Sequence, residues 1–130
     1  MNNLFNKTIA VLSKVFFNAY NKIEKLPEKS EELAGQYVLK IHPKGYVMQL
    51  RLYNSKGRPE FDIDLHDHDE EKEYTHGGIH IHEYKWRYEK RIKRSIYERQ
   101  SGRNLTNDEY VTYIKNLDFS KIKQIQVRYI

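Results

Sequence analysis

A two-residue repeat of apolar and polar side chains recurs in three segments and restricts this part of the chain to β-structure. It runs through 46–53 ("YVMQLRLY"), 60–68 ("EFDIDLHDH") and 78–86 ("GIHIHEYKW"). Successive side chains of a strand point to opposite faces of the sheet, so each segment has one apolar and one polar face. With the strand-like segment 37–43 and turn sequences in between, the pattern predicts a mainly antiparallel sheet over residues 36–86.

The apolar faces also predict how the strands pair. A slip of one residue would bury polar side chains, so the alternation fixes which face of each strand is polar. In the register that pairs Leu52 with Phe61, Arg51 lies opposite Asp62, and Gln49 lies opposite Asp64. Across the next pair of strands, the favoured register places His66 near His80, Asp64 near His82 and Asp62 near Tyr84. One polar face then carries Arg51, Asp62, Asp64, His66, His80, His82 and Tyr84.

The first 26 residues have the spacing of an amphipathic helix. Apolar residues recur alternately four and three positions apart from Phe5 to Leu26, and Pro27 ends the pattern. Three lysines interrupt the apolar run, so we predict no membrane span. The stripe is expected to pack on the sheet of the same chain. A homodimer through this helix and a helix lying on a membrane surface are the alternatives.

Residues 87–130 are expected to form a basic helix, a second helix and a last strand. Tyr88, Ile92 and Ile96 lie at helical spacing, and Gly102 is a suitable helix stop. Thr106 and Glu109 have the spacing of a capping box at the start of the second helix. The predicted fold is a single α+β domain over 1–130. It consists of an N-terminal helix, a mainly antiparallel sheet of about four or five strands, and two C-terminal helices before a last strand.

Composition narrows the chemistry that the polar face can perform. The chain has no cysteine, which excludes thiolate catalysis, disulfides and cysteine-based zinc sites. Its net charge of +5 is unevenly distributed. Residues 60–73 carry eight acids and one lysine, whereas residues 85–103 carry eight bases and two acids. Any metal must therefore be held by histidine and carboxylate, beside a basic segment.

Three interpretations of the histidine face remain open. In the first, His80 and His82 bind a divalent metal such as zinc with His66 or Asp64, and water takes the remaining position. In the second, no cofactor is needed, because two histidines act as general base and general acid on an RNA phosphodiester, which Arg51 contacts. In the third, the histidines line a solvated face and pair with neighbouring acids.

The basic segment that follows also has two interpretations. Its cations alternate with aromatic side chains, as in proteins that bind phosphates and stack on bases. The alternative is that these cations neutralise the acidic segment of the same chain. The candidate nucleic-acid-binding residues are Lys85, Trp86, Arg87, Lys90, Arg91 and Arg94.

Residues 49–86 resemble small bacterial and phage-encoded domains of the kind found at the C-termini of polymorphic toxins. The shared features are a Q-x-R-x-Y strand, a G-R turn, a D-I-D strand that ends in histidine, and H-x-H followed by an aromatic residue. Many such domains are regarded as ribonucleases. The resemblance implies a site that comprises Arg51, Asp62, Asp64, His66, His80 and His82.

Together these features predict a nucleic-acid-directed hydrolase or transesterase that acts on RNA. In this prediction His80, His82 and His66 supply acid and base or bind a metal, and Asp64 and Asp62 orient them. The alternative is a non-catalytic phage or mobile-element protein that binds or regulates, with or without a histidine-bound metal. RNA and a cognate protein inhibitor are the expected partners. The chain carries no recognisable export signal, so the expected location is the cytoplasm.

Overall fold

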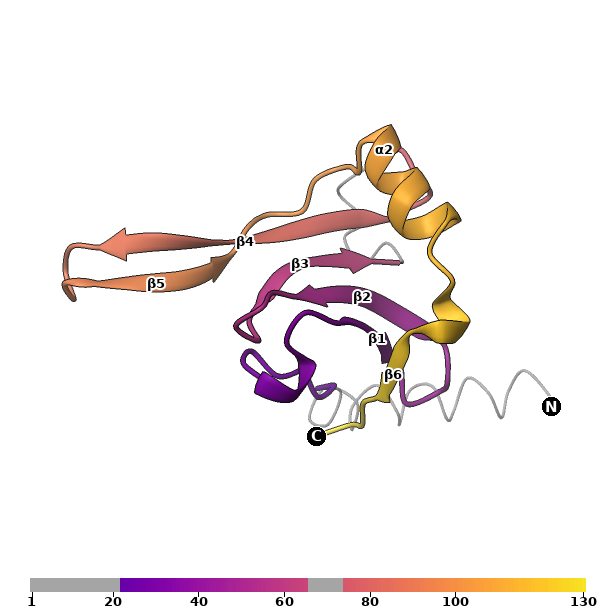
Figure 1. Ribbon diagram of the computed structural model, residues 1–130, viewed down its shortest axis with the longest axis horizontal. Coiled ribbons are helices and arrows are strands. Elements are labelled where there is room, and N and C mark those ends of the chain that lie inside the picture. Colours follow the sequence, from indigo (N-terminus) through magenta and orange to yellow (C-terminus); the bar gives the residue numbers. More distant parts are fainter. Residues whose placement is uncertain (1–21, 66–73) are drawn as a thin grey trace, which may run out of the picture.

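The computed structural model describes residues 22–65 and 74–130, which build one six-stranded sheet (Figure 1). The strand order is β5-β4-β3-β2-β1-β6. Neighbouring strands are antiparallel except for β6, which pairs in parallel with β1. The strands are β1 (Tyr37–Ile41), β2 (Val47–Tyr53), β3 (Pro59–Asp64), β4 (His80–Glu89), β5 (Arg94–Arg99) and β6 (Lys123–Gln126).

Helical structure in the described residues is short. The one α-helix among them is α2 (Asn107–Tyr110), and a π-helical turn, η2 (Val111–Lys115), continues it. Two 3₁₀ turns, η1 (Glu31–Leu33) and η3 (Phe119–Lys121), complete the set. In Figure 1 the chain from α2 to η3 passes from the β4 side of the sheet to β6.

The two faces of the sheet are buried in different ways. Leu39, Leu50, Ile63 and Ile81 lie on one face and pack against apolar side chains of the α2–η3 segment. Burial of these side chains is the main stabilising contribution to the fold. On the other face a smaller apolar cluster lies at the β1 side of the sheet, and the polar residues of β2, β3 and β4 lie beside it. The smaller cluster consists of Leu26, Leu33, Val38, Tyr53 and Val127.

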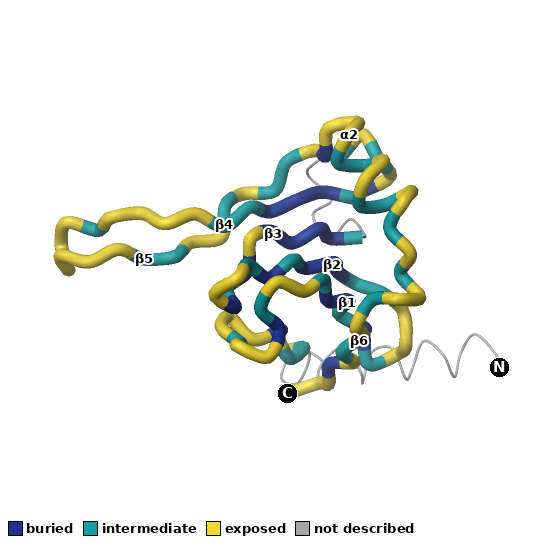
Figure 2. The backbone as a smooth tube through the Cα atoms, viewed as in Figure 1, coloured by how far each residue is buried: buried dark blue, intermediate teal, exposed yellow. Residues whose placement is uncertain are grey.

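The strands β4 and β5 extend beyond the rest of the sheet as a two-stranded arm (Figure 1). Figure 2 shows that most of this arm is exposed, whereas the central parts of β1 to β4 are buried. At its tip Lys93 adopts a left-handed backbone conformation with φ 51°. The arm brings Trp86 opposite Tyr97, and Arg87 opposite Ile96.

The predicted fold class is wrong in its helices. The protein is mostly sheet, and the segment expected to be a basic helix forms the outer part of β4 and the whole of β5. The alternation of His80, His82 and Tyr84 simply continues through Trp86 and Tyr88, and aromatic residues favour strands. Pairing with β5 therefore outweighs the helical spacing of Tyr88, Ile92 and Ile96. Of the two predicted C-terminal helices, only the second exists.

The N-terminal helix expected over residues 1–26 is contradicted at its C-terminal end. Residues 22–26 are not helical: Ile23 forms a β-bridge with Tyr129, and Leu26 is buried in the smaller apolar cluster. The remainder of the predicted helix, and with it the proposed dimer surface, lies outside the described residues. Within residues 22–65 and 74–130, no helix has the length and apolar character required to cross a membrane.

The capping box at the start of α2 is confirmed. The Thr106 hydroxyl accepts a hydrogen bond from the backbone of Glu109 at 3.1 Å, and Glu109 Oε1 accepts one from the backbone of Thr106 at 2.8 Å. Arg103 also donates to both Glu109 oxygens, at 2.8 and 2.9 Å, and is the main reason that the pKa of Glu109 falls to about 2. The box thereby joins α2 to the segment that follows β5.

Thr106→Ala is expected to lower the free energy of unfolding by about 1 kcal/mol, because it leaves a backbone donor of α2 without its cap. Urea denaturation of the purified protein measures this change. Thr112→Ala is the matched control, since Thr112 is an exposed threonine six residues later in the same helical segment. Equal effects of the two substitutions would contradict a specific role for the cap.

Candidate functional site

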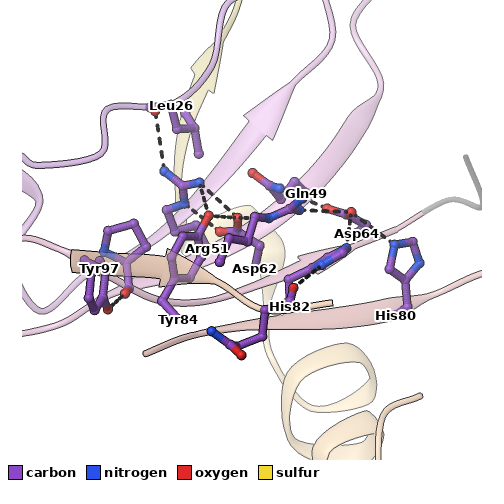
Figure 3. Close-up of polar contacts among 12 residues, drawn as sticks. Leu26, Gln49, Arg51, Asp62, Asp64, His80, His82, Tyr84 and Tyr97 are labelled. Carbon is purple, nitrogen blue, oxygen red and sulfur yellow. Dashed lines mark hydrogen bonds and ion pairs between the residues drawn. The ribbon is translucent and has the colours of Figure 1, made fainter. Parts of the chain in front are cut away.

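The polar face of β2, β3 and β4 carries two adjacent side-chain groups (Figure 3). One group is built on the ion pair between Arg51 and Asp62, and the other on Asp64 with His80 and His82. Strand pairing places them together, because Arg51 lies opposite Asp62, and Asp64 lies opposite His80. All five of these side chains are polar or charged, and all are buried.

Arg51 and Asp62 form a bidentate pair inside the protein. Arg51 Nε donates to Asp62 Oδ1 at 2.6 Å, and Nη2 donates to Oδ2 at 2.9 Å. Nη2 also donates to the Tyr84 hydroxyl at 3.0 Å, and Nη1 donates to the carbonyl of Pro27 at 3.1 Å. The Tyr53 hydroxyl donates to the same carbonyl at 2.7 Å. Arg51 thus ties the chain before β1 to the centre of the sheet.

The protonation state of Tyr84 follows from its surroundings. Burial raises the pKa of Tyr84 well above its ordinary value, and the negative charge of Asp62 raises it further. The hydroxyl therefore stays protonated and donates a hydrogen bond to Asp62 Oδ2 at 2.6 Å. Burial alone would lower the pKa of Arg51, but the hydrogen bonds and charge of Asp62 outweigh burial and raise it, so the guanidinium stays charged.

Asp64 is the meeting point of the second group. Its Oδ2 lies 3.1 Å from His80 Nε2 and 3.3 Å from His82 Nε2. Gln49 Nε2 donates to Oδ1 at 2.9 Å, and Arg99 Nη2 lies 3.3 Å from Oδ2. Relative exposures of 5% for Asp64, 1% for His80 and 9% for His82 show that all three residues are buried.

The other ring nitrogen of each histidine contacts a backbone carbonyl. His80 Nδ1 lies 2.8 Å from Gly78 O, and His82 Nδ1 lies 2.9 Å from Gln100 O. A carbonyl oxygen can only accept, so both Nδ1 atoms must carry a proton. Both Nε2 atoms are thereby directed at Asp64 in a fixed orientation.

The chain after β5 completes the surroundings of the histidines. Arg103 forms a β-bridge with Ile81, which aligns residues 100–103 with β4. A Cβ atom on Gly102 would lie 2.9 Å from His80 Cδ2 and 3.1 Å from His82 Cε1. The Tyr74 ring also stacks on His80, with a centroid distance of 4.3 Å. Both imidazole rings are therefore held by close packing.

A pocket of about 350 Å³ lies next to this cluster. Gln49 and Arg99 line the pocket and also contact Asp64, so they connect the two. Among its lining residues, the basic side chains outnumber the single acid, Glu28. The basic ones are Lys25, Lys40, Arg51, Arg58 and Arg99. A pocket with this charge is suited to an anionic group such as a phosphate.

The candidate nucleic-acid-binding residues all lie on the arm, and all are exposed. Trp86 is 58% exposed, and the Arg58 guanidinium lies 5.4 Å from the centre of its ring. Arg87 Nε contacts Glu98 at 2.8 Å, and its Nη1 contacts Glu89 at 2.8 Å, so acids of the arm itself partly neutralise it. Their role in nucleic-acid binding stays a prediction. The set is Lys85, Trp86, Arg87, Lys90, Arg91 and Arg94.

The structure brings most of the predicted site residues together, in a different pairing. Asp64 contacts both His80 and His82 and lies opposite His80, because the β3–β4 register differs by two residues from the predicted one, which placed Asp64 near His82. Asp62, expected to orient the histidines, contacts Arg51 and Tyr84. Arg51 lines the pocket, but its donor atoms contact Asp62 and the Pro27 carbonyl. The expected contact of Arg51 with phosphate stays a prediction. His66 lies outside the described residues.

Sequence reasoning missed several contributors to the site. Arg99 falls in the segment predicted as a basic helix that ends at Gly102, and the sequence predicts no role for Tyr74 or Gln100. The sequence offers one signal for the role of Gly102, because a glycine next to a strand allows the backbone to approach neighbouring side chains closely. No family model, curated protein or solved structure matches the chain.

Proposed function

We propose that this protein is a nucleic-acid-directed hydrolase or transesterase that cleaves RNA, with Asp64, His80 and His82 at the reaction centre. The observation that carries the proposal is the junction of this cluster with a cationic pocket. Arg99 and Gln49 belong to both. A phosphate bound by the pocket cations would lie beside the histidines, and cations next to a reacting phosphate stabilise its developing charge.

The arm is suited to bind the rest of the RNA strand. Three aromatic side chains form a row on the same face as the histidines. Tyr97 contacts Tyr84, with ring centroids 5.6 Å apart, and Trp86, with ring centroids 5.0 Å apart. Exposed aromatic rings stack on unpaired bases, and neighbouring cations hold the phosphates. This aromatic row begins at the pocket and continues onto the exposed arm. A single-stranded substrate fits this arrangement best.

The geometry favours metal binding by the histidines over general acid–base catalysis. A general acid and a general base act on opposite sides of the scissile bond, each within hydrogen-bond reach of its own oxygen. Here both Nε2 atoms point to the same carboxylate oxygen, at 3.1 and 3.3 Å. That convergence supports metal binding more than proton transfer between two separate positions.

A non-catalytic binding protein is the second candidate. Burial of Asp64 and His80 favours it, because a buried polar cluster can simply stabilise the sheet. In that case the arm and the pocket would bind an anionic partner without changing it. The two candidates differ in whether RNA is cut.

The experiment incubates the purified protein with single-stranded RNA oligonucleotides and with bulk tRNA. His80→Ala and His82→Ala are each expected to slow cleavage about 100-fold or more, the loss typical of groups that act directly in a reaction. His76→Ala is the matched control, because His76 stacks on Tyr110 rather than joining the cluster. Circular dichroism checks that each variant folds. Full cleavage by both folded cluster variants, or no cleavage by the wild-type protein, would overturn the proposal.

A further inference from the structure

The Asp64–His80–His82 cluster has the arrangement of a three-ligand metal site. Each residue offers one donor atom, and these atoms lie within 4.8 Å of one another. In a tetrahedral zinc site with bonds of about 2.0–2.1 Å, the donor atoms lie about 3.3 Å apart. The distances from Asp64 Oδ2 to the two Nε2 atoms, 3.1 and 3.3 Å, agree with this spacing. The three donors are thus placed to share one ion.

The hydrogen bonds of the Nδ1 atoms prepare the opposite nitrogens for a metal. Because Nδ1 of each ring donates to a carbonyl, Nε2 of the neutral imidazole carries the lone pair. Metal-binding histidines commonly donate their second N–H to a backbone carbonyl in this way, which fixes both tautomer and ring orientation. Tyr74 and Gly102, packed against the rings, fix the orientation further.

A divalent cation suits this arrangement electrostatically. Two neutral imidazoles direct their Nε2 lone pairs toward the same carboxylate oxygen, and a cation held between the three donor atoms would attract all of them. It would also offset the charge of the buried Asp64 carboxylate.

We propose that Asp64, His80 and His82 bind one divalent transition-metal ion, for which zinc is the natural probe. Two nitrogens and one oxygen suit zinc and its first-row neighbours, whereas calcium and magnesium prefer sites made of oxygen atoms. In three-ligand zinc sites the fourth position holds water or substrate. The catalytic role of the metal rests on the proposed RNA cleavage, but metal binding itself can be measured without RNA.

The test starts from full-length protein freed of metal by dialysis against a chelator. Calorimetric titration with Zn²⁺ is expected to give about one ion per chain, and Co²⁺ is expected to give the visible absorption bands of a low-coordinate site. Asp64→Asn and His82→Gln, which conserve side-chain volume, are each expected to weaken Zn²⁺ binding about 100-fold or more. His76→Ala should bind Zn²⁺ as the wild-type protein does. Circular dichroism checks the fold of each variant.

The outcomes separate this inference from the proposed function. Absence of saturable one-to-one binding in the wild-type protein, or unchanged binding in both folded variants, would overturn the metal site. RNA cleavage that persists unchanged in the metal-free protein would also overturn the metal's role while leaving the ribonuclease proposal intact. Tight, Asp64-dependent Zn²⁺ binding without any RNA cleavage would support the site and reject the ribonuclease.

Discussion

Asp62→Ala is expected to lower the free energy of unfolding by about 3 to 5 kcal/mol, the usual loss when one member of a buried ion pair is removed. Asp62 is 0% exposed and Arg51 is 6% exposed, so the substitution leaves the guanidinium buried without its counter-charge. Tyr84 also loses the acceptor of its 2.6 Å hydrogen bond. Urea denaturation, followed by circular dichroism, measures the change.

Two further variants show whether this cost comes from the buried charge. Glu98→Ala removes the partner of Arg87 in an ion pair whose side chains are 51% and 45% exposed, and should leave the free energy of unfolding nearly unchanged. Adding Arg51→Met to Asp62→Ala removes the stranded cation and should restore part of the lost stability. If Asp62→Ala cost no more than Glu98→Ala, the pair could not be what holds this face together.

The Arg51–Asp62 pair also explains how the pocket is built. Arg51 Nη1 donates to the carbonyl of Pro27 at 3.1 Å, and Leu26 and Glu28 line the pocket on either side of this contact. The pair therefore positions the part of the pocket lining that Leu26 and Glu28 form. Arg51 positions the lining through its neighbours, whereas Arg99, whose side chain is 42% exposed and contacts Asp62 and Asp64, is better placed to meet a phosphate.

The pairing of β2 with β3 could be predicted from the sequence. A short turn joins the two strands, and both have clean alternation, so turn and pattern select the same register. The expected neighbours Arg51 and Asp62, and likewise Gln49 and Asp64, are confirmed. The placement of Arg51 opposite Asp62 was therefore predictable from the sequence, whereas their burial as an ion pair was not.

The pairing of β3 with β4 could be predicted only in part. A slip of two residues keeps every side chain on its face, so the polar face is as expected while its partners differ. Asp64 lies opposite His80, and Asp62 opposite His82, two residues away from the predicted register. The connection between these strands is too long for a turn to fix the register. The contact of Asp64 with His82 was therefore expected, whereas its place opposite His80 came only from the structure.

The contacts that fix the histidine rings have no sequence pattern at all. A backbone carbonyl such as Gln100 O is present at every residue, so its role as acceptor for His82 Nδ1 depends on where the chain runs. The path of the chain through Gln100 depends on β5 being a strand. The sequence instead predicted a helix there, because the helical spacing of Tyr88, Ile92 and Ile96 overlaps with the two-residue alternation of the strand.

Gly102→Ala is expected to weaken Zn²⁺ binding about 10- to 100-fold, the range seen when residues that orient metal ligands are changed. The new methyl group would meet His80 Cδ2 at 2.9 Å, the Tyr74 hydroxyl at 2.9 Å and His82 Cε1 at 3.1 Å. The contacts with His80 and the Tyr74 hydroxyl are too short and the contact with His82 is tight, so we expect the rings, and with them the Nε2 atoms, to shift relative to Asp64. Calorimetric titration of the metal-free variant measures the change.

Ser101→Ala is the matched control, since Ser101 is the exposed neighbour of Gly102 in the same segment. It should bind Zn²⁺ as the wild-type protein does, and urea denaturation should confirm that both variants are folded. Gly102→Ala removes no donor atom, so a selective loss of binding can arise only from displaced rings. Wild-type affinity in Gly102→Ala would mean that packing does not hold the rings in place. The Nδ1 hydrogen bonds to Gly78 and Gln100 would then have to orient the two histidines by themselves.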